Sequence, residues 1–156
     1  SKIRWLAPHS YIIADNKCSD LALREVEIMA EAGANATTCL GIAPVETIDL
    51  FIKECQRLNI DSIIDMTNVE SPIEILRKLK NVPDIVVLDR INRQIPYYQI
   101  NQIKGSYDIM VAVTGGETMR DIQSMILNNA DIVIVQESFY SSQSDELINT
   151  FLKKIK

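Results

Sequence analysis

A regular repeat of strand-like runs constrains the fold of this chain more than any other feature of its sequence. Short runs rich in β-branched residues recur with starts about 24 residues apart, and a helical pattern follows each of them. The six runs are Tyr11 to Ala14, Ala36 to Leu40, Ile60 to Ile64, Ile85 to Leu88, Ile109 to Val113 and Ile132 to Val135. Strands that alternate with helices at this spacing predict successive βα units and a parallel sheet, which is an α/β fold.

The number of units leaves two architectures open. A closed (β/α)8 barrel of the TIM type needs eight units, and common examples have roughly 200 to 250 residues, whereas six units fill the 156 residues of this chain. We therefore expect either six units of a (β/α)8 TIM barrel that lacks its first two, or an open, doubly wound parallel sheet. Residues 1–10 have the pattern of a helix end followed by a proline turn, and the serine at position 1 indicates a fragment or a processed chain.

The helical patterns have apolar stripes that predict packing against the sheet rather than cofactor binding. The predicted core positions are Ala22, Val26, Met29 and Ala30 in the first helix, Ile48, Phe51, Ile52 and Cys55 in the second, and Leu147, Ile148, Phe151, Leu152 and Ile155 in the last. Ser71-Pro72-Ile73-Glu74 predicts a capping box with proline at the first helical position, and Gly33 and Gly105 stand where helices should end. No linker interrupts the chain, so we expect a single, partial barrel domain over residues 1–156.

Composition excludes several classes of partner. The net charge of -5 and the lack of a basic stripe argue against nucleic acid. No apolar run is long enough to span a membrane, and the first residues lack the layout of a signal peptide. The three cysteines, Cys18, Cys39 and Cys55, have neither zinc-site spacing nor even pairing, which indicates a reducing, cytoplasmic location.

A charged cluster follows the first predicted strand. Asp15 and Lys17 are two residues apart, so they should point to the same side of the strand while Asn16 points away. Asp20 should lie in the first turn of the next helix. Carboxylates on both sides of the lysine would hold it protonated, as a proton donor and an electrostatic clamp. The alternatives are that Asp20 or Ser19 only caps the helix and that Lys17 is an ordinary solvated lysine.

Other strand ends also have polar residues or glycines, which predicts a site along that edge of the sheet. They are Asp65, Asp89-Arg90, Thr114-Gly115-Gly116 and Gln136-Glu137. Two glycines before a helix let backbone amides converge on an anion such as a phosphate. The alternative for Gly115 and Gly116 is an ordinary tight turn.

Asp15-x-Lys17-x-x-Asp20 resembles the Asp-x-Lys-x-x-Asp motif of the orotidine-monophosphate decarboxylase superfamily. The rest of the chain is most similar to the 3-hexulose-6-phosphate synthases, particularly their archaeal forms. The supporting stretches are Glu46 to Ile52, Ser62 to Pro72, Val111 to Gly116 and Ala130 to Val135. The similarity covers about Ser10 to the C-terminus and makes the first strand here the third of the family barrel, which implies that another segment or chain supplies two units.

The resemblance implies a sugar-phosphate lyase or synthase, an aldehyde-lyase that joins formaldehyde to ribulose 5-phosphate through a metal-stabilised enediolate. A magnesium ion would act there as a Lewis acid. The implied catalytic residues are Asp15 as a magnesium ligand, Lys17 as a protonated group near the enediolate, Asp20 as a residue that reaches the partner subunit's site in a homodimer, and Asp65 as the family aspartate at its strand end. Gly115 and Gly116 would offer backbone amides to the substrate phosphate.

The sequence also departs from the family pattern. Gln136-Glu137 stands where the family has a phosphate-binding glycine-arginine pair, and an unpaired acid there would repel a dianion. Asp89 replaces the usual histidine, the second acidic metal ligand belongs to a strand outside this chain, and His9 is predicted to be a surface residue. These departures leave open a catalytically degenerate barrel homologue with a structural or regulatory role. The resemblance also leaves open a keto-sugar-phosphate decarboxylase, because the same triad serves that chemistry in the superfamily. Open strand edges and an open barrel interior predict a homodimer or larger assembly.

Overall fold

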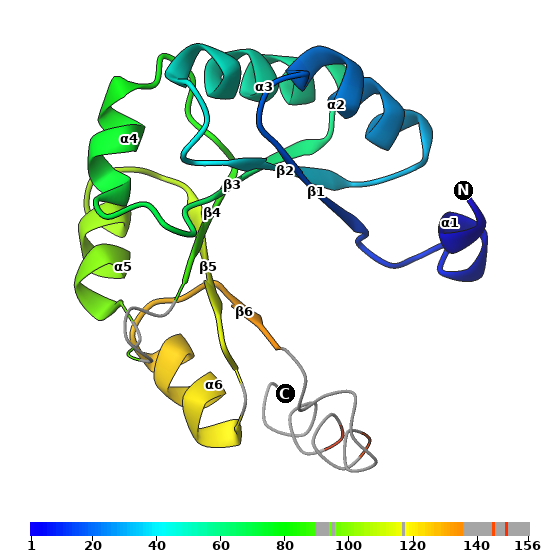
Figure 1. Ribbon diagram of the computed structural model, residues 1–156. Helices are drawn as coiled ribbons and strands as arrows, with labels where there is room; N and C mark the ends of the chain where they lie inside the picture. The colour runs from blue at the N-terminus through cyan, green and yellow to red at the C-terminus, as the bar shows by residue number, and fades with distance from the viewer. Residues whose placement is uncertain (90–93, 95, 117, 136–144, 146–148, 150–156) are drawn as a thin grey trace. The chain divides into compact units, whose positions relative to one another are not determined.

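The computed structural model describes residues 1–89, 94, 96–116, 118–135, 145 and 149. Contacts group the chain into two compact units, Ser1–Val87 and Leu88–Lys156, and Figure 1 labels the helices and strands of both. In chain order the elements are α1 Lys2–Leu6, β1 Ile13–Cys18, α2 Ala22–Glu31, β2 Ala36–Leu40, α3 Val45–Leu58, β3 Asp61–Asp65, α4 Pro72–Lys78, β4 Ile85–Leu88, α5 Tyr97–Lys104, β5 Met110–Thr114, α6 Met119–Leu127 and β6 Ile132–Ile134. The predicted alternation of strands and helices is confirmed.

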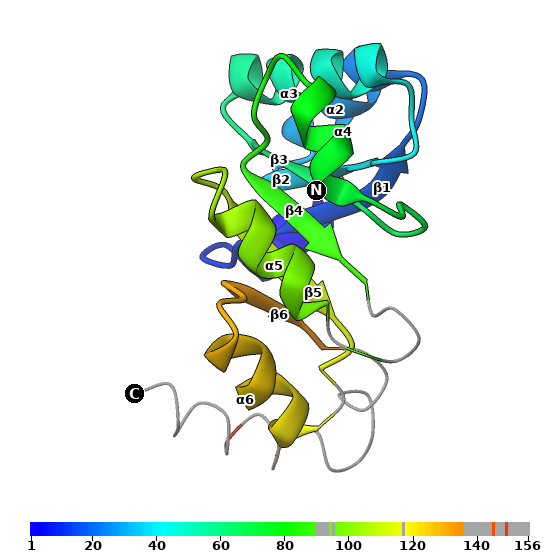
Figure 2. The same cartoon turned by 90° about the vertical axis from the view of Figure 1, so that its left-hand side faces the viewer.

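In the first unit, β1 to β4 pair in parallel and in the order of the chain. The helices α2 and α3 pack against the strands on one side of this sheet, as Figures 1 and 2 both show. The predicted stripe of α3 is confirmed, because Ile48, Phe51, Ile52 and Cys55 are all fully buried. Such a continuous apolar layer between helices and a parallel sheet is the main source of stability in this class of fold.

The second unit contains a parallel pair, β5 and β6, in which Ala112 lies opposite Ile132. The helices α5 and α6 pack on β5 and β6 respectively (Figure 2). Thr118 and Asp121 form a capping box at the start of α6, since each side chain accepts a hydrogen bond from the other residue's backbone. This box fixes where α6 begins, just beyond the Gly115-Gly116 turn.

Two predictions about helix ends have different outcomes. Ser71 is the N-cap of α4 and Pro72 its first residue, as expected, but the Ser71 side chain makes no capping hydrogen bond. The predicted capping box at Ser71 is therefore wrong, although the position of the helix start is right. Gly33 has φ +85 just after α2, the left-handed conformation in which a helix commonly ends.

The three cysteines are buried and none forms a disulfide with another. His9 is exposed, as predicted. In the part of the chain that the structure describes, no helix is both long enough and apolar enough to cross a membrane. The predicted stripe from Leu147 to Ile155 and the pair Gln136-Glu137 fall outside the described residues.

Candidate active site

The strand β1 is irregular at the residues that the sequence analysis singled out. Its pairing with β2 loses register between Ala14 and Cys18, which marks a bulge. Lys17 lies in this bulge with φ +50, the left-handed conformation, which costs a residue with a side chain about 1 to 2 kcal/mol. Bulges frequently occur beside active sites, where they re-aim a side chain. The strand therefore continues past the predicted end at Ala14 and presents Lys17 from strained backbone.

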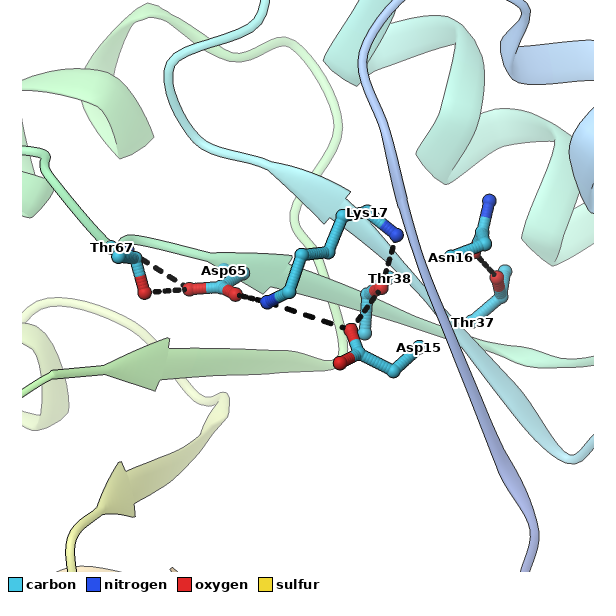
Figure 3. Close-up of polar contacts among 7 residues, drawn as sticks. All are labelled: Asp15, Asn16, Lys17, Thr37, Thr38, Asp65 and Thr67. Carbon is cyan, nitrogen blue, oxygen red and sulfur yellow. Dashed lines mark hydrogen bonds and ion pairs between the residues drawn. The ribbon is translucent and has the colours of Figure 1, made fainter.

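The ammonium group of Lys17 lies between two carboxylates. Its Nζ is 3.6 Å from Asp15 Oδ1 and forms a closer ion pair with Asp65 Oδ2, at the end of β3 (Figure 3). Asp65 is only 5% exposed, whereas the side chains of Lys17 and Asp15 are 49% and 59% exposed. Asp65 is therefore the buried member of the cluster, whereas Lys17 and Asp15 are accessible to solvent.

Opposing effects set the charge of Asp65. Burial alone raises the pKa of a carboxyl group, but the hydrogen bond from Lys17 and those from Thr67 outweigh it, so the pKa of Asp65 is lowered. Thr67 donates from its backbone N at 2.9 Å and from its hydroxyl at 2.6 Å. The hydrogen bond to Asp65 also raises the pKa of Lys17, against the opposite effect of its partial burial. At neutral pH the structure therefore favours a carboxylate at Asp65 and an ammonium group at Lys17.

Side chains on β1 point alternately to the two sides of the sheet, as predicted. Thr38 donates a 2.9 Å hydrogen bond to Asp15 Oδ1 on the side of Lys17. On the other side Asn16 accepts a hydrogen bond from Thr37 and donates one of 3.1 Å to Glu25 of α2. Asp15 and Lys17 thus share the side of the sheet away from α2 (Figure 3).

Asp15 lies beside Lys17 as predicted, but Asp20 does not, so the prediction that Asp20 is the second carboxylate beside the lysine is wrong. Asp20 is exposed, and its Oδ1 accepts a 2.8 Å hydrogen bond from the backbone N of Leu21. The bulge explains the difference, because it turns Lys17 across β2 toward Asp65, whereas Asp20 has already passed into the turn before α2. Sequence spacing alone gave no sign of this redirection.

In the second unit, Gly115 and Gly116 are buried at the end of β5. Gly115 has φ +88, and a Cβ on Gly116 would lie 2.7 Å from Val133 Cγ1, so both positions require glycine. The backbone N of Gly116 donates a 3.2 Å hydrogen bond to Ile134 O. That bond engages one of the two amides that the sequence analysis assigned to a phosphate. Beside the turn, Thr114 donates a hydrogen bond to Asp89.

Among the residues that the structure describes, no group of three or more histidine, cysteine, aspartate or glutamate side chains is arranged to hold a metal ion. The donor set at Asp15 is nevertheless compatible with magnesium. Proteins commonly bind Mg²⁺ through one or two carboxylates while substrate and water oxygens complete the octahedron. Asp15 offers one half-exposed carboxylate of this kind.

Two threonines of the cluster were missed from the sequence. Thr67 follows Asp65 by two residues, and Asp-x-Thr is a pattern in which the carboxylate accepts hydrogen bonds from the residue two positions later. That signal could have identified Thr67. Thr38 lies within the buried strand β2, where nothing in the sequence distinguishes it from Thr37.

The fold and the site together define a class, an α/β protein of the (β/α)8-barrel type with charged side chains at the carboxyl ends of its parallel strands. The crystal structure of 3-hexulose-6-phosphate synthase from Salmonella typhimurium matches with a TM-score of 0.85 at 23% identity, over 97% of this chain and 76% of that chain. The structure of 3-keto-L-gulonate-6-phosphate decarboxylase from Vibrio cholerae matches with a TM-score of 0.78 at 16% identity, over 99% of this chain and 76% of that one. These matches confirm the barrel-type prediction over the open, doubly wound sheet.

By sequence, the chain is similar to bifunctional enzymes named Fae/Hps. The protein of that name from Methanothrix thermoacetophila is 35% identical over 161 residues, which is 99% of this chain and 41% of the relative. The one from Archaeoglobus fulgidus is 30% identical over 99% of this chain and 41% of the relative. The chain thus spans about two fifths of the length of the curated relatives it matches. No protein-family model matches it.

Proposed function

We propose that this chain carries the lysine-bearing part of a 3-hexulose-6-phosphate synthase, an aldehyde-lyase that condenses formaldehyde with ribulose 5-phosphate. The observation that supports it most is the Asp15–Lys17–Asp65 cluster at the strand ends, in a chain similar over nearly its full length to enzymes named Fae/Hps. The similarity in fold to 3-hexulose-6-phosphate synthase agrees with it.

The reaction requires a stabilised anion. A base takes a proton from C1 of ribulose 5-phosphate to give an enediolate. C1 then forms a bond to the formaldehyde carbon while the π bond of the formaldehyde carbonyl breaks toward oxygen, and that oxygen takes up a proton. Lys17, held as a cation by Asp65, stabilises the enediolate oxygens by its charge. The left-handed backbone and the two carboxylates already hold Lys17 in position, so little reorganisation is needed when the anion forms.

Asp15 is the residue that would hold magnesium, and the metal when bound supplies Lewis-acid polarisation of the substrate oxygens. The Thr38 hydroxyl already orients Asp15 Oδ1, which is the support that metal-binding carboxylates usually have. We place the substrate phosphate at the Thr114-Gly115-Gly116 turn, where the Gly116 amide would exchange its 3.2 Å bond to Ile134 for the phosphate.

We further propose a cytoplasmic homodimer in which Asp20 contributes to the partner subunit's site. Leu21 and Leu23, next to Asp20, are 63% and 50% exposed. An exposed apolar pair beside an accessible carboxylate is suited to an interface between copies. The buried, unpaired cysteines are compatible with a reducing compartment.

A second candidate is decarboxylation of a keto-sugar phosphate, which the fold match to 3-keto-L-gulonate-6-phosphate decarboxylase supports. Loss of carbon dioxide from such a substrate also leaves an enediolate, so the same lysine would serve both reactions. The third candidate is a homologue without catalysis that has a structural or regulatory role.

One set of assays separates the three. The purified protein is incubated with magnesium and ribulose 5-phosphate plus formaldehyde, and separately with 3-keto-L-gulonate 6-phosphate. We expect formaldehyde consumption in the first reaction and its loss in Lys17→Ala. Carbon dioxide release in the second reaction alone would favour the decarboxylase. Neither activity, together with no binding of ribulose 5-phosphate by calorimetry, would favour the catalytically degenerate homologue.

A further inference from the structure

Thr38 links the two charged groups of β1 through one hydroxyl. Thr38 is a buried residue in the centre of β2, only 5% exposed. The backbone N of Lys17 donates a 2.9 Å hydrogen bond to Thr38 Oγ1, and Thr38 Oγ1 donates a 2.9 Å hydrogen bond to Asp15 Oδ1. Figure 3 shows the hydroxyl between them.

The chemistry of a hydroxyl fixes the direction of both bonds. An ionised carboxylate only accepts hydrogen bonds, so the single Thr38 proton goes to Asp15 and a lone pair is left for the amide of Lys17. That amide lies in the part of β1 where the register with β2 is lost. The Thr38 side chain therefore takes the place of a backbone carbonyl at the one strained residue of the site.

The strained backbone makes this contact consequential. Asp15 to Lys17 stand opposite the single residue Thr38, because Ala14 pairs with Thr37 and Cys18 already pairs with Cys39. A chain that left the bulge and paired regularly would move by two residues along β2, and Lys17 would lose its place beside Thr38. We propose that Thr38 is a positioning residue for the reaction: its hydroxyl holds Lys17 in the bulge, with the ammonium group toward Asp65, and aims the Asp15 carboxylate toward the substrate. The expected effect of Thr38 on turnover rests on the proposed function, whereas its contact with Lys17 does not.

Thr37 provides a matched control. It precedes Thr38 on the same strand, is fully buried and also donates a hydrogen bond, but its partner is Asn16 on the side facing α2. Thr37→Val and Thr38→Val each remove one buried hydroxyl from β2 with nearly the same change of shape. Only the second removes contacts with Lys17 and Asp15.

The kinetic test compares Thr38→Val, Thr38→Ser and Thr37→Val with the wild type. We expect Thr38→Val to lower kcat about 10- to 100-fold, the usual effect of losing a group that orients a ligand or catalytic residue, with a smaller change in KM for ribulose 5-phosphate. Thr38→Ser keeps the hydroxyl and should recover most of kcat, and Thr37→Val should stay near the wild type. A Thr38→Val enzyme with wild-type kcat, or an equal loss in Thr37→Val, would overturn the inference.

Hydrogen exchange of the Lys17 amide, followed by NMR, tests the same contact without any activity. We expect a protected amide in the wild type, Thr38→Ser and Thr37→Val, and faster exchange in Thr38→Val. Unprotected exchange in the wild type would overturn the inference even if Thr38→Val does not fold. A wild type without turnover whose Lys17 amide depends on the Thr38 hydroxyl would refute the proposed function while supporting this contact.

Discussion

Replacing Lys17 with methionine separates the charge of the lysine from its shape. Methionine has a similar length and has the same difficulty as lysine in the left-handed conformation, so the bulge itself is little changed. The substitution removes the ammonium group from Asp65, which keeps its two hydrogen bonds from Thr67. The pKa of Asp65 should then rise, because burial continues to oppose its charge.

The loss of stability can be estimated from the contact. A hydrogen bond to a charged group contributes about 1.5 to 3 kcal/mol, and because Lys17 is half exposed solvent screening lowers this to about 1 to 2 kcal/mol. For a chain of this size the melting temperature would fall by about 2 to 8 °C. Typical stabilities are about 5 to 15 kcal/mol, so the variant should fold. Loss of the cation opposite the developing enediolate should lower kcat about 100- to 1000-fold.

The pH dependence has a defined sign. The pKa of Asp65 is lower in the folded protein than in the unfolded chain. Its contribution to the free energy of unfolding is therefore complete above the ordinary pKa of aspartate and is lost as the pH falls through the folded pKa. Urea unfolding between pH 2 and 7 measures this effect. The difference in the free energy of unfolding between wild type and Lys17→Met should be largest at pH 7 and should shrink at acid pH. Carboxyl carbon NMR of Asp65 gives the pKa directly. An unchanged Asp65 pKa in the variant, or a stability difference independent of pH, would refute the proposed pairing.

Three further outcomes are expected. Thr67→Val removes the 2.6 Å bond to Asp65 and should lower the free energy of unfolding by about 1 kcal/mol; no change in urea unfolding would contradict the contact. Gly116→Ala places a Cβ 2.7 Å from Val133 Cγ1 and should destabilise the protein by about 1 to 3 kcal/mol. The melting temperature should fall accordingly, and an unchanged melting temperature would contradict the need for glycine at this position. Sedimentation equilibrium should give twice the mass of one chain, and Leu21→Glu should weaken the dimer; a stable wild-type monomer would contradict the proposed assembly.

Much of the fold could be predicted because most strands contain a compact apolar run and the helices that pack on the sheet bury one apolar stripe. β2 and β4 match their predicted limits, and α3 buries the residues expected of it. The limits of β1 were wrong, because a bulge stabilised by contacts with β2 lets polar residues continue a strand. Hydrophobic periodicity does not register this kind of tertiary contact.

The site was predicted in part for a similar reason. Alternation along a strand is local, so Asp15 and Lys17 were correctly placed on one side. The choice between Asp20 and Asp65 as the second carboxylate depends on which strand lies within reach of Lys17, and only the sheet order decides that. Ser71 illustrates the opposite case, in which a capping pattern is present but the side chain does not make the bond.

The most direct test of the proposed function is deuterium incorporation at C1 of ribulose 5-phosphate, followed by NMR in deuterated water with magnesium and without formaldehyde. It detects enediolate formation alone, the step assigned to Lys17 and its two carboxylates. We predict exchange at C1 catalysed by the wild type and almost none with Lys17→Met. No exchange with the folded wild type, or equal exchange with Lys17→Met, would contradict it.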